Sequence, residues 1–287
     1  MKIKTRKYLF LATALLNFWN IEMYAQSNND YVQMPFLAKE ARLKGDKILA
    51  NSYAQDYINK YLFKQKEDVL YSKENLEFIW QYLGNTKSNA FKMFQLKSEK
   101  INAVLGRDKA EYAIRSIIAE EYLPTEESIK KDKPDWDNIE KTVTDEFGTL
   151  GQEVVQGRRM MYYSKIRDWV NFGKYYVLYF EKALKRPEYI VNEPSWCVFE
   201  NVDDPEVVKF ACDVVMKYAI EEWYSKEPYA YDTYANLLYK SRRVKEAIGW
   251  QEKAVKLAKG TPYEDENNGH LEKMLKGKKT WLTPANN

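Results

Sequence analysis

The chain has 287 residues, of which 30% are charged and 15% are aromatic, and its formal net charge is +3. Only 11 glycines and 9 prolines are present, so the composition excludes a disordered or collagen-like chain and favours an ordered, helix-rich protein. The near balance of positive and negative side chains provides no electrostatic footprint for nucleic acid, and we expect no nucleic-acid partner.

The first 25 residues have the order of a secretory leader. Four cations lie among the first seven residues, an apolar run follows from Tyr8 to Leu16, and a more polar stretch ends at Ala25. This run is too short to span a bilayer, and no later segment approaches the roughly 20 apolar residues of a membrane helix. We therefore expect residues 1–25 to be a signal peptide, the protein to be periplasmic or secreted, and no membrane span.

Apolar residues recur at helical spacing almost throughout the chain from about Asp46 onward. In its first half, short apolar stripes are separated by polar or glycine breaks, for example at Gly84 and Gly106. No sustained alternation of β-branched residues marks a strand. We expect residues 26–123 to form an N-terminal helical region.

The stretch PTEESIKKDKPDWD, residues 124–137, is polar and contains two prolines. We interpret it as a polar linker between the first helical region and a second one over residues 138–287, or as a long surface connection. In the second region, a strong helix carries apolar side chains at intervals of three or four: Trp169, Phe172, Tyr176, Phe180 and Ala183. A later helix is predicted from Pro205 to about Trp223.

A hairpin is predicted around the turn at Asp203, and it carries both cysteines of the chain. Cys197 and Cys212 lie on opposite arms of this hairpin, at similar distances from the turn. A structural disulfide between them is compatible with this placement and with an oxidising periplasm. Cysteine is also a common small residue in packed helical cores, so the two alternatives stay open. The spacing fits no redox motif, and two cysteines with one histidine do not make an ordinary structural zinc site.

The stretch YDTYANLLYKSRRVKEAIGWQEKAVKLAKG, residues 231–260, is typical of two helices joined by a short turn. Its first helix carries Tyr231, Tyr234, Ala235 and Leu238, and its second carries Ala247, Trp250 and Ala254. This pattern resembles a tetratricopeptide repeat, a helix-turn-helix unit of about 34 residues. Arg242 stands where the turn commonly has glycine, and Lys259 stands where a proline often closes the repeat. The resemblance implies an all-α, tetratricopeptide-like superhelix built of stacked helical hairpins.

A longer series of segments, FIWQYLGNTKSNAF, WCVFENVDDPEVVKFA and the stretch above, has a second resemblance. It is similar to the helical C-terminal region that follows a thioredoxin domain in a group of exported bacterial thioredoxin-like proteins, and it covers roughly residues 46–275. The chain has no Cys-x-x-Cys motif, and only about 20 residues separate the predicted leader from the first helix. The resemblance therefore implies a stand-alone version of the accessory region, and the redox function of the thioredoxin domain is not carried over.

Candidate catalytic residues are few. His270, the only histidine, lies in the polar segment EDENNGH, where we do not expect burial beside a serine or cysteine nucleophile. The acidic pairs Asp203 with Asp204 and Asp135 with Asp137 are explained by turns and helix caps. No glycine-rich phosphate loop follows a predicted strand. We expect no catalytic residue, no metal site and no cofactor.

The resemblance to a tetratricopeptide repeat implies a non-enzymatic protein that binds a peptide or protein partner. The partner would lie on a concave face lined by the first helices of the hairpins. Candidate partner-binding residues are Tyr231, Tyr234, Asn236 and Lys240. The two tyrosines fit core positions equally well.

Two alternative functions remain. The second resemblance suggests an accessory protein of a periplasmic thioredoxin-like redox system. The abundance of tyrosine suggests carbohydrate binding, since exposed aromatic rings are good contacts for sugars as well as peptides. Consecutive pairs such as Tyr162 with Tyr163 and Tyr175 with Tyr176 are not expected to face the core together.

Overall fold

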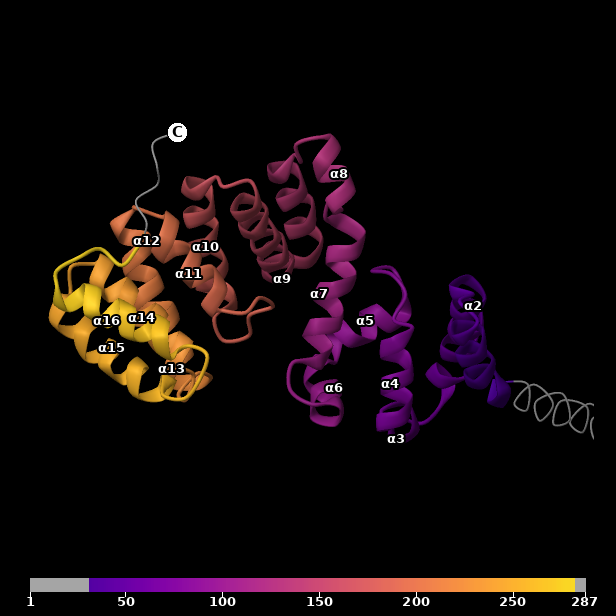
Figure 1. Ribbon diagram of the computed structural model, residues 1–287. Coiled ribbons are helices and arrows are strands. Elements are labelled where there is room, and N and C mark those ends of the chain that lie inside the picture. Colours follow the sequence, from indigo (N-terminus) through magenta and orange to yellow (C-terminus); the bar gives the residue numbers. More distant parts are fainter. Residues whose placement is uncertain (1–30, 282–287) are drawn as a thin grey trace, which may run out of the picture. The chain divides into compact units, whose positions relative to one another are not determined.

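The computed structural model describes residues 31–281, so the predicted signal peptide, residues 1–25, lies outside the described residues. Every regular element in the described range is a helix, and successive helices pack in contacting pairs. The predicted all-α fold of stacked helical hairpins is therefore confirmed (Figure 1). Within residues 31–281, no helix is both long enough and apolar enough to cross a membrane.

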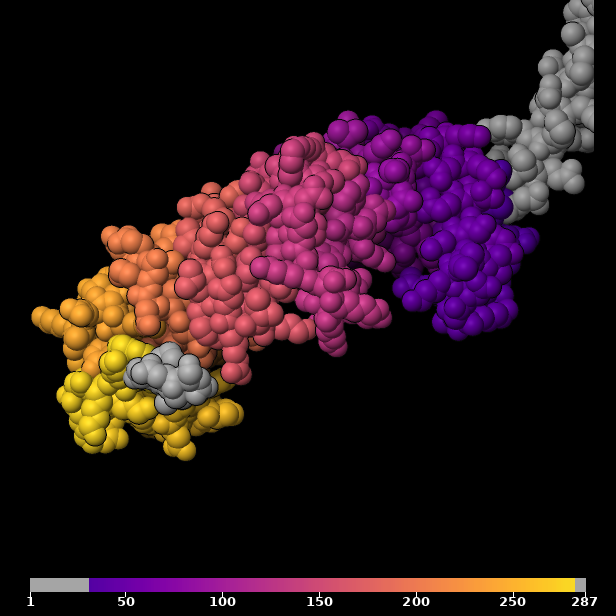
Figure 2. Space-filling model, turned by 90° about the horizontal axis from the view of Figure 1, so that it is seen from above, coloured from indigo at the N-terminus to yellow at the C-terminus, as the bar shows by residue number. Residues whose placement is uncertain are grey.

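The chain divides into two compact units, Met1–Glu121 and Tyr122–Asn287. Within each unit, segments that follow one another in sequence occupy neighbouring parts of the surface, as the gradual change of colour shows (Figure 2). This order is expected when each hairpin packs mainly on its neighbours in the chain.

The first unit consists of short helices separated by polar or glycine-containing turns. Its elements are a helix over residues 31–43, α2 (Lys47–Lys60), the 3-10 helix η1 (Leu62–Lys64), α3 (Glu67–Leu70), α4 (Lys73–Gln81), α5 (Asn89–Leu96), α6 (Ser98–Leu105) and α7 (Lys109–Tyr122). The side chains of Ser72 and Ser88 accept hydrogen bonds from backbone N–H groups in the first turns of α4 and α5. These N-caps fix where the two helices begin. Leu76, Ile79 and Phe94 are fully buried, and α4 and α5 both contact α6.

The second unit contains the longer helices and the candidate site. Its elements are α8 (Glu126–Lys131), α9 (Trp136–Lys165), α10 (Trp169–Ala183), α11 (Asn192–Asn201), α12 (Pro205–Phe210), η2 (Ala211–Met216), α13 (Lys217–Glu222), α14 (Pro228–Lys240), α15 (Val244–Ala258) and α16 (Glu264–Leu275). The stretch 124–137, interpreted as a linker, contains α8 and the start of α9. Its side chains Thr125 and Asp135 cap these two helices.

At the beginning of this unit, α9 and α10 pack against each other over an extensive contact. Gly148 has φ +62° and ψ −142° inside α9, so the helix is kinked there. Gly157 allows a close approach, because a Cβ atom on it would lie 2.7 Å from the Tyr189 ring and 2.8 Å from the Tyr179 ring. The predicted core stripe of α10 is confirmed for Phe172, Tyr176, Phe180 and Ala183, which are buried, but not for Trp169, which is half-buried at the start of the helix.

The tyrosine pairs differ from the prediction. Tyr162, Tyr163, Tyr175 and Tyr176 are all buried. Tyr163 stacks on Tyr175 across the α9–α10 contact, with ring centroids 5.6 Å apart. The expectation that such pairs cannot all face inward is wrong here, because Tyr162 packs on Trp136 from the first half of α9, whereas Tyr163 packs on Tyr175 of α10.

The predicted helix from Pro205 to about Trp223 is present, but it is not uniform. It consists of α12, a π-helical segment η2 and α13. π-Helical turns are rare and occur frequently at functional sites, because the extra residue redirects side chains on one face. Asp213 and Val214 lie in this segment and reach the surface beside α12.

The predicted hairpin over residues 231–260 is confirmed as α14 and α15. The small residues Ala235, Ala247 and Ala254 are fully buried, and Trp250 packs on the ring of Tyr234 with centroids 5.0 Å apart. Helix α14 contacts α11, α12, η2 and α13 as well as α15 and α16. It is therefore the central helix of the second unit, surrounded by other helices.

Candidate functional site

Two adjoining hollows of the second unit lie around α12, and we call them the cationic pocket and the apolar groove. The cationic pocket has a volume of about 680 Å³ and is bordered by α12, the turn between α14 and α15, and the segment after α16. The apolar groove consists of a hollow of about 600 Å³ between α10 and α12, continued by one of about 350 Å³ along η2. Residues Glu206, Lys209 and Asp213 line both the pocket and the groove, so the two are contiguous.

The apolar groove exposes aliphatic side chains to solvent. Val170 is 85% exposed, and Trp169 is half-buried beside it at the start of α10. Val177 and Val207 line both parts of the groove. A contiguous apolar hollow bordered by polar residues is typical of a surface that receives an apolar side chain of a ligand.

The cationic pocket contains more positive than negative side chains. Its cations are Lys209, Lys240, Arg242, Arg243 and Lys279, and its carboxylates are Asp203, Glu206 and Asp213. Arg243 forms an ion pair with Asp213, and its Nη2 atom lies 2.7 Å from Glu246 Oε2. The hydrogen bonds to Glu246 and Asp213 raise the pKa of the Arg243 guanidinium. Arg243 is therefore occupied by partners within the protein.

Lys240 also has partners within the protein. Its side chain is only 7% exposed, and its Nζ atom donates a 2.7 Å hydrogen bond to the carbonyl oxygen of Phe199. The same atom lies 3.5 Å from Asp203 Oδ1 and 5.6 Å from the centre of the Trp281 ring. Burial lowers the pKa of Lys240, although Asp203 acts in the opposite direction. Lys240 mainly joins α14 to the end of α11.

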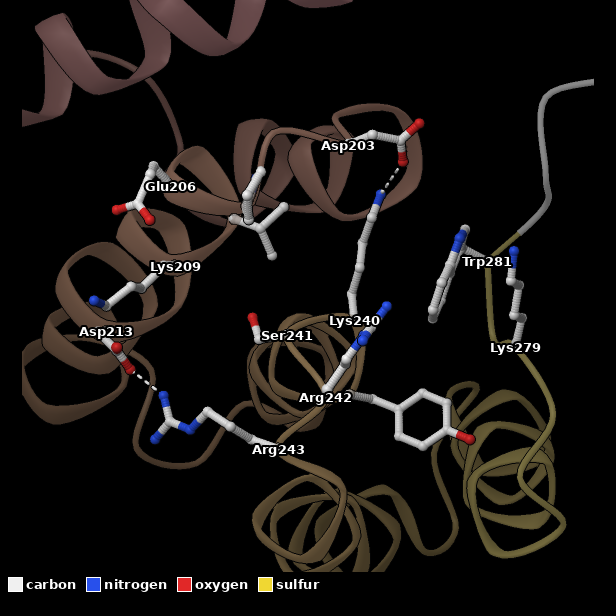
Figure 3. A pocket seen from close by; sticks show the side chains of 13 residues that line it. Asp203, Glu206, Lys209, Asp213, Lys240, Ser241, Arg242, Arg243, Lys279 and Trp281 are labelled. Atoms are coloured by element: carbon white, nitrogen blue, oxygen red, sulfur yellow. Dashed lines mark hydrogen bonds and ion pairs between the residues drawn. The ribbon is translucent and has the colours of Figure 1, made fainter.

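Arg242 differs from both neighbours. It has φ +64°, and the turn is closed by the hydrogen bonds Arg242 N to Tyr239 O and Arg243 N to Leu238 O, each 3.0 Å long. This helix ending places a residue in the left-handed region and favours glycine there. The guanidinium of Arg242 is exposed and forms no hydrogen bond or ion pair with any residue in the range 31–281. Figure 3 shows it extending into the middle of the pocket.

The candidate partner-binding residues are only partly at the surface. Asn236 is 0% exposed and Tyr234 is 5% exposed, so both lie in the core rather than at a surface; for Tyr234 this is the core position that its spacing fits equally well. Both lie on the central helix α14, where neighbouring helices cover every side. Tyr231 is half-buried against Trp250, with ring centroids 5.5 Å apart, and only Lys240 lines the pocket.

The disulfide alternative for the two cysteines is not found. Cys197 and Cys212 are both free thiols. Cys197 lies beside Ser164 of α9, whereas the sulfur of Cys212 lies 4.0 Å from Arg243 Nη1 of the α14–α15 turn, so the two side chains face different neighbours. Burial raises the pKa of the Cys197 thiol and raises that of Cys212 to about 12. Both environments disfavour thiolate chemistry.

His270 is buried, contrary to the expectation from its polar neighbours in the sequence. Its Nδ1 atom lies 2.9 and 3.0 Å from the two carboxylate oxygens of Asp232. Gln251 Nε2 donates a 2.6 Å hydrogen bond to Asp232 and a 3.0 Å bond to the carbonyl of Asn267. No serine, threonine or cysteine of the described chain hydrogen-bonds to His270. This buried network joins α14, α15 and α16.

Two residues that carry the site were not among the predicted binding residues. Arg242 could have been singled out from the sequence, because arginine stands where this turn commonly has glycine. Trp281 could not, since its role depends on the segment after α16 folding back so that its ring lies 6.0 Å from Phe199 and 6.3 Å from Tyr239. Among residues 31–281, no group of three or more histidine, cysteine, aspartate or glutamate side chains is arranged to hold a metal ion.

No protein-family model, curated protein or solved structure matches this chain.

Proposed function

We propose that this chain is an exported, non-enzymatic helical protein that binds an extended peptide segment of a partner protein in the apolar groove and the cationic pocket around α12. The observation that carries this proposal is the continuity of the two hollows across Glu206, Lys209 and Asp213. One end of this surface is apolar and the other is charged. An extended peptide reaches both, because successive residues advance about 3.3 Å along the chain and each side chain meets a different part of the surface.

Three further features support binding over catalysis. The buried Asp232–His270 pair has no nucleophile bonded to it among the described residues, both thiols have raised pKa values, and the charged groups around α12 lie in an open pocket. General acid or base catalysis requires a more enclosed site. The resemblance of α14 and α15 to a tetratricopeptide repeat also supports a binding role.

A peptide library displayed on phage tests the proposal. We expect selection on the immobilised protein to enrich peptides that bind in fluorescence polarisation. Substitution Val170→Asp should weaken this binding about tenfold, because a desolvated carboxylate in an apolar contact costs more than the lost methyl groups alone. The side chain of Val170 is largely exposed, so the fold should tolerate the change.

Ile190→Asp is the matched control, because Ile190 is 61% exposed in the same unit and lines neither hollow. It should bind the selected peptides as the unaltered protein does. Absence of enrichment, or equal binding by the Val170→Asp protein, would refute the proposal.

Carbohydrate binding is the second candidate, and a strip of aromatic rings favours it. The strip consists of Tyr218, Trp223, Tyr224, Tyr229 and Tyr263. Successive ring centroids are 5.2 to 6.3 Å apart, and the side chains of Trp223 and Tyr263 are 37% and 39% exposed. Affinity electrophoresis in gels containing soluble polysaccharides, with Trp223→Ala as the comparison, tests this candidate. Unchanged mobility of both proteins in every gel would count against it.

The accessory role in a thioredoxin-like redox system has less support. It depends on the second sequence resemblance, and neither cysteine environment favours a thiolate.

A further inference from the structure

We propose that the cationic pocket recognises a carboxylate of the bound peptide and that Arg242 is the residue that contacts it. This inference rests on the proposed peptide-binding function and specifies its ligand as an acidic peptide. Three separate features of the pocket support it: the pairing of its charges, the backbone of Arg242, and the aromatic side chains that form one of its walls.

The pairing of charges leaves the pocket with a positive surplus. Arg243 and Lys240 are held by Asp213 and Asp203, respectively. The remaining cations of the pocket are Lys209, Arg242 and Lys279, and none of them forms an ion pair with a residue in the described part of the chain. Glu206 is the one lining carboxylate without such a pair there. Three free cations against one free carboxylate attract an anionic ligand group.

The backbone of Arg242 places its side chain at the pocket, because the residue with φ +64° lies in the turn that ends α14 and its guanidinium extends from this turn into the pocket (Figure 3). A residue other than glycine in the left-handed region costs roughly 1 kcal/mol or more, and glycine would remove this strain. The side chain makes no compensating polar contact with residues 31–281. A guanidinium provides a planar pair of donors that matches a carboxylate, and Arg242, unlike the exposed Arg167 with the same backbone conformation, presents these donors inside a pocket.

The aromatic wall makes this contact stronger than it would be in open solvent. Trp281 and Tyr239 line one side of the pocket, and the ammonium of Lys279 lies 5.6 Å from the centre of the Trp281 ring. In Figure 3, Arg242 lies between this wall and the Arg243–Asp213 pair. A charged hydrogen bond beside apolar surface is screened less than one surrounded by water.

Two matched pools of fluorescent degenerate peptides test the inference. Both pools contain one fixed leucine, and they differ only in a second fixed residue, glutamate in one pool and glutamine in the other. We expect the glutamate pool to bind the unaltered protein about tenfold more tightly, which is the usual size of a charge-assisted hydrogen bond. The difference should shrink as sodium chloride is raised.

Arg242→Gly and Arg167→Gly form a matched pair of variants. Arg167 has φ +59° in the α9–α10 turn, is exposed and lines neither hollow. Glycine should relieve backbone strain at both positions, so neither variant should have a lower melting temperature. Arg242→Gly should lose the preference for the glutamate pool, and Arg167→Gly should keep it.

The outcomes separate the two proposals. If both pools bind equally, or if Arg242→Gly keeps the preference, the carboxylate inference is overturned while peptide binding stands. If neither pool binds and phage selection also fails, the proposed function falls as well. If inorganic phosphate alone binds in an Arg242-dependent manner and neither pool does, the pocket is a small-anion site and the peptide carboxylate is refuted.

Discussion

His270 Nδ1 lies 2.9 and 3.0 Å from the two carboxylate oxygens of Asp232, 38 residues earlier in the chain. The two side chains are 10% and 6% exposed, respectively, and they join the last helix α16 to the central helix α14. Buried polar groups are costly unless they are paired, so each residue depends on the other.

Removal of either partner should destabilise the second unit strongly. We expect Asp232→Ala and His270→Ala each to lower the free energy of unfolding by about 2–4 kcal/mol, because the remaining group is left buried without its partner. The double variant should lose less than the sum of the single losses. Urea denaturation followed by circular dichroism measures these values. Glu272→Ala, which removes an exposed ion pair with Lys276 on α16, should leave stability unchanged. Additive losses in the double variant would contradict the interpretation of a coupled pair.

The close approach of α9 and α10 at Gly157 gives a second prediction. Gly157→Ala should destabilise the protein by about 1–3 kcal/mol, because its Cβ would lie 2.7 and 2.8 Å from the Tyr189 and Tyr179 rings. Gly249→Ala is the control. Gly249 lies within α15, and a Cβ there meets no atom within 4 Å. That change should raise stability by up to about 1 kcal/mol. Thermal melts of both variants check the prediction, and a shift of the same sign in both would contradict it.

The buried thiols give a third prediction. Burial raises the pKa of Cys212 to about 12, so almost none of it is thiolate at pH 8 and iodoacetamide should not modify it in the native protein. Cys197, whose pKa is also raised, should react slowly. Both should react within minutes in guanidinium chloride, as mass spectrometry of the alkylated chain would show. A native protein that is two mass units lighter and resists alkylation when unfolded would instead establish a disulfide.

Alkaline pH should weaken the fold through buried tyrosines. Burial raises the pKa values of Tyr175 and Tyr234 to about 12, from an ordinary value of 10.0. Between pH 10 and 12 the unfolded chain therefore loses protons that the native protein keeps. The contribution of these two tyrosines to the free energy of unfolding is complete below pH 10 and is lost as pH rises toward 12. Urea midpoints at a series of pH values measure this loss. Tyr234→Phe should reduce the slope, and an unchanged slope would contradict this assignment.

Local sequence patterns predicted the helices of this protein well. The repeat of Phe172, Tyr176 and Phe180 reports the buried side of α10 directly, since residues three or four apart share one face of a helix. The α14–α15 hairpin was predicted for the same reason, because its alanines and Trp250 mark the contact between two neighbouring helices. These interactions are short-range in sequence, so a pattern of about 30 residues contains both partners.

The proposed binding surface could not be predicted in this way. Asn236 was a candidate for an exposed face, and for Tyr234 an exposed and a core position were equally compatible with the sequence. Which side chains of α14 are buried depends on segments before and after the hairpin that pack against it. The cationic pocket joins side chains from α12, the α14–α15 turn and the segment after α16, with Asp213 and Arg243 separated by 30 residues.

The sequence by itself determined the all-α class, the hairpin pairing and the aromatic core of α10, because these depend on helical periodicity and on neighbouring residues. Only the tertiary structure decided that α14 is enclosed, that His270 is buried against Asp232 and that Arg242 extends into a pocket without an ion pair to any residue from 31 to 281. The physical reason is that burial of a helix face, and the pairing of a charge, depend on which distant segments pack against it.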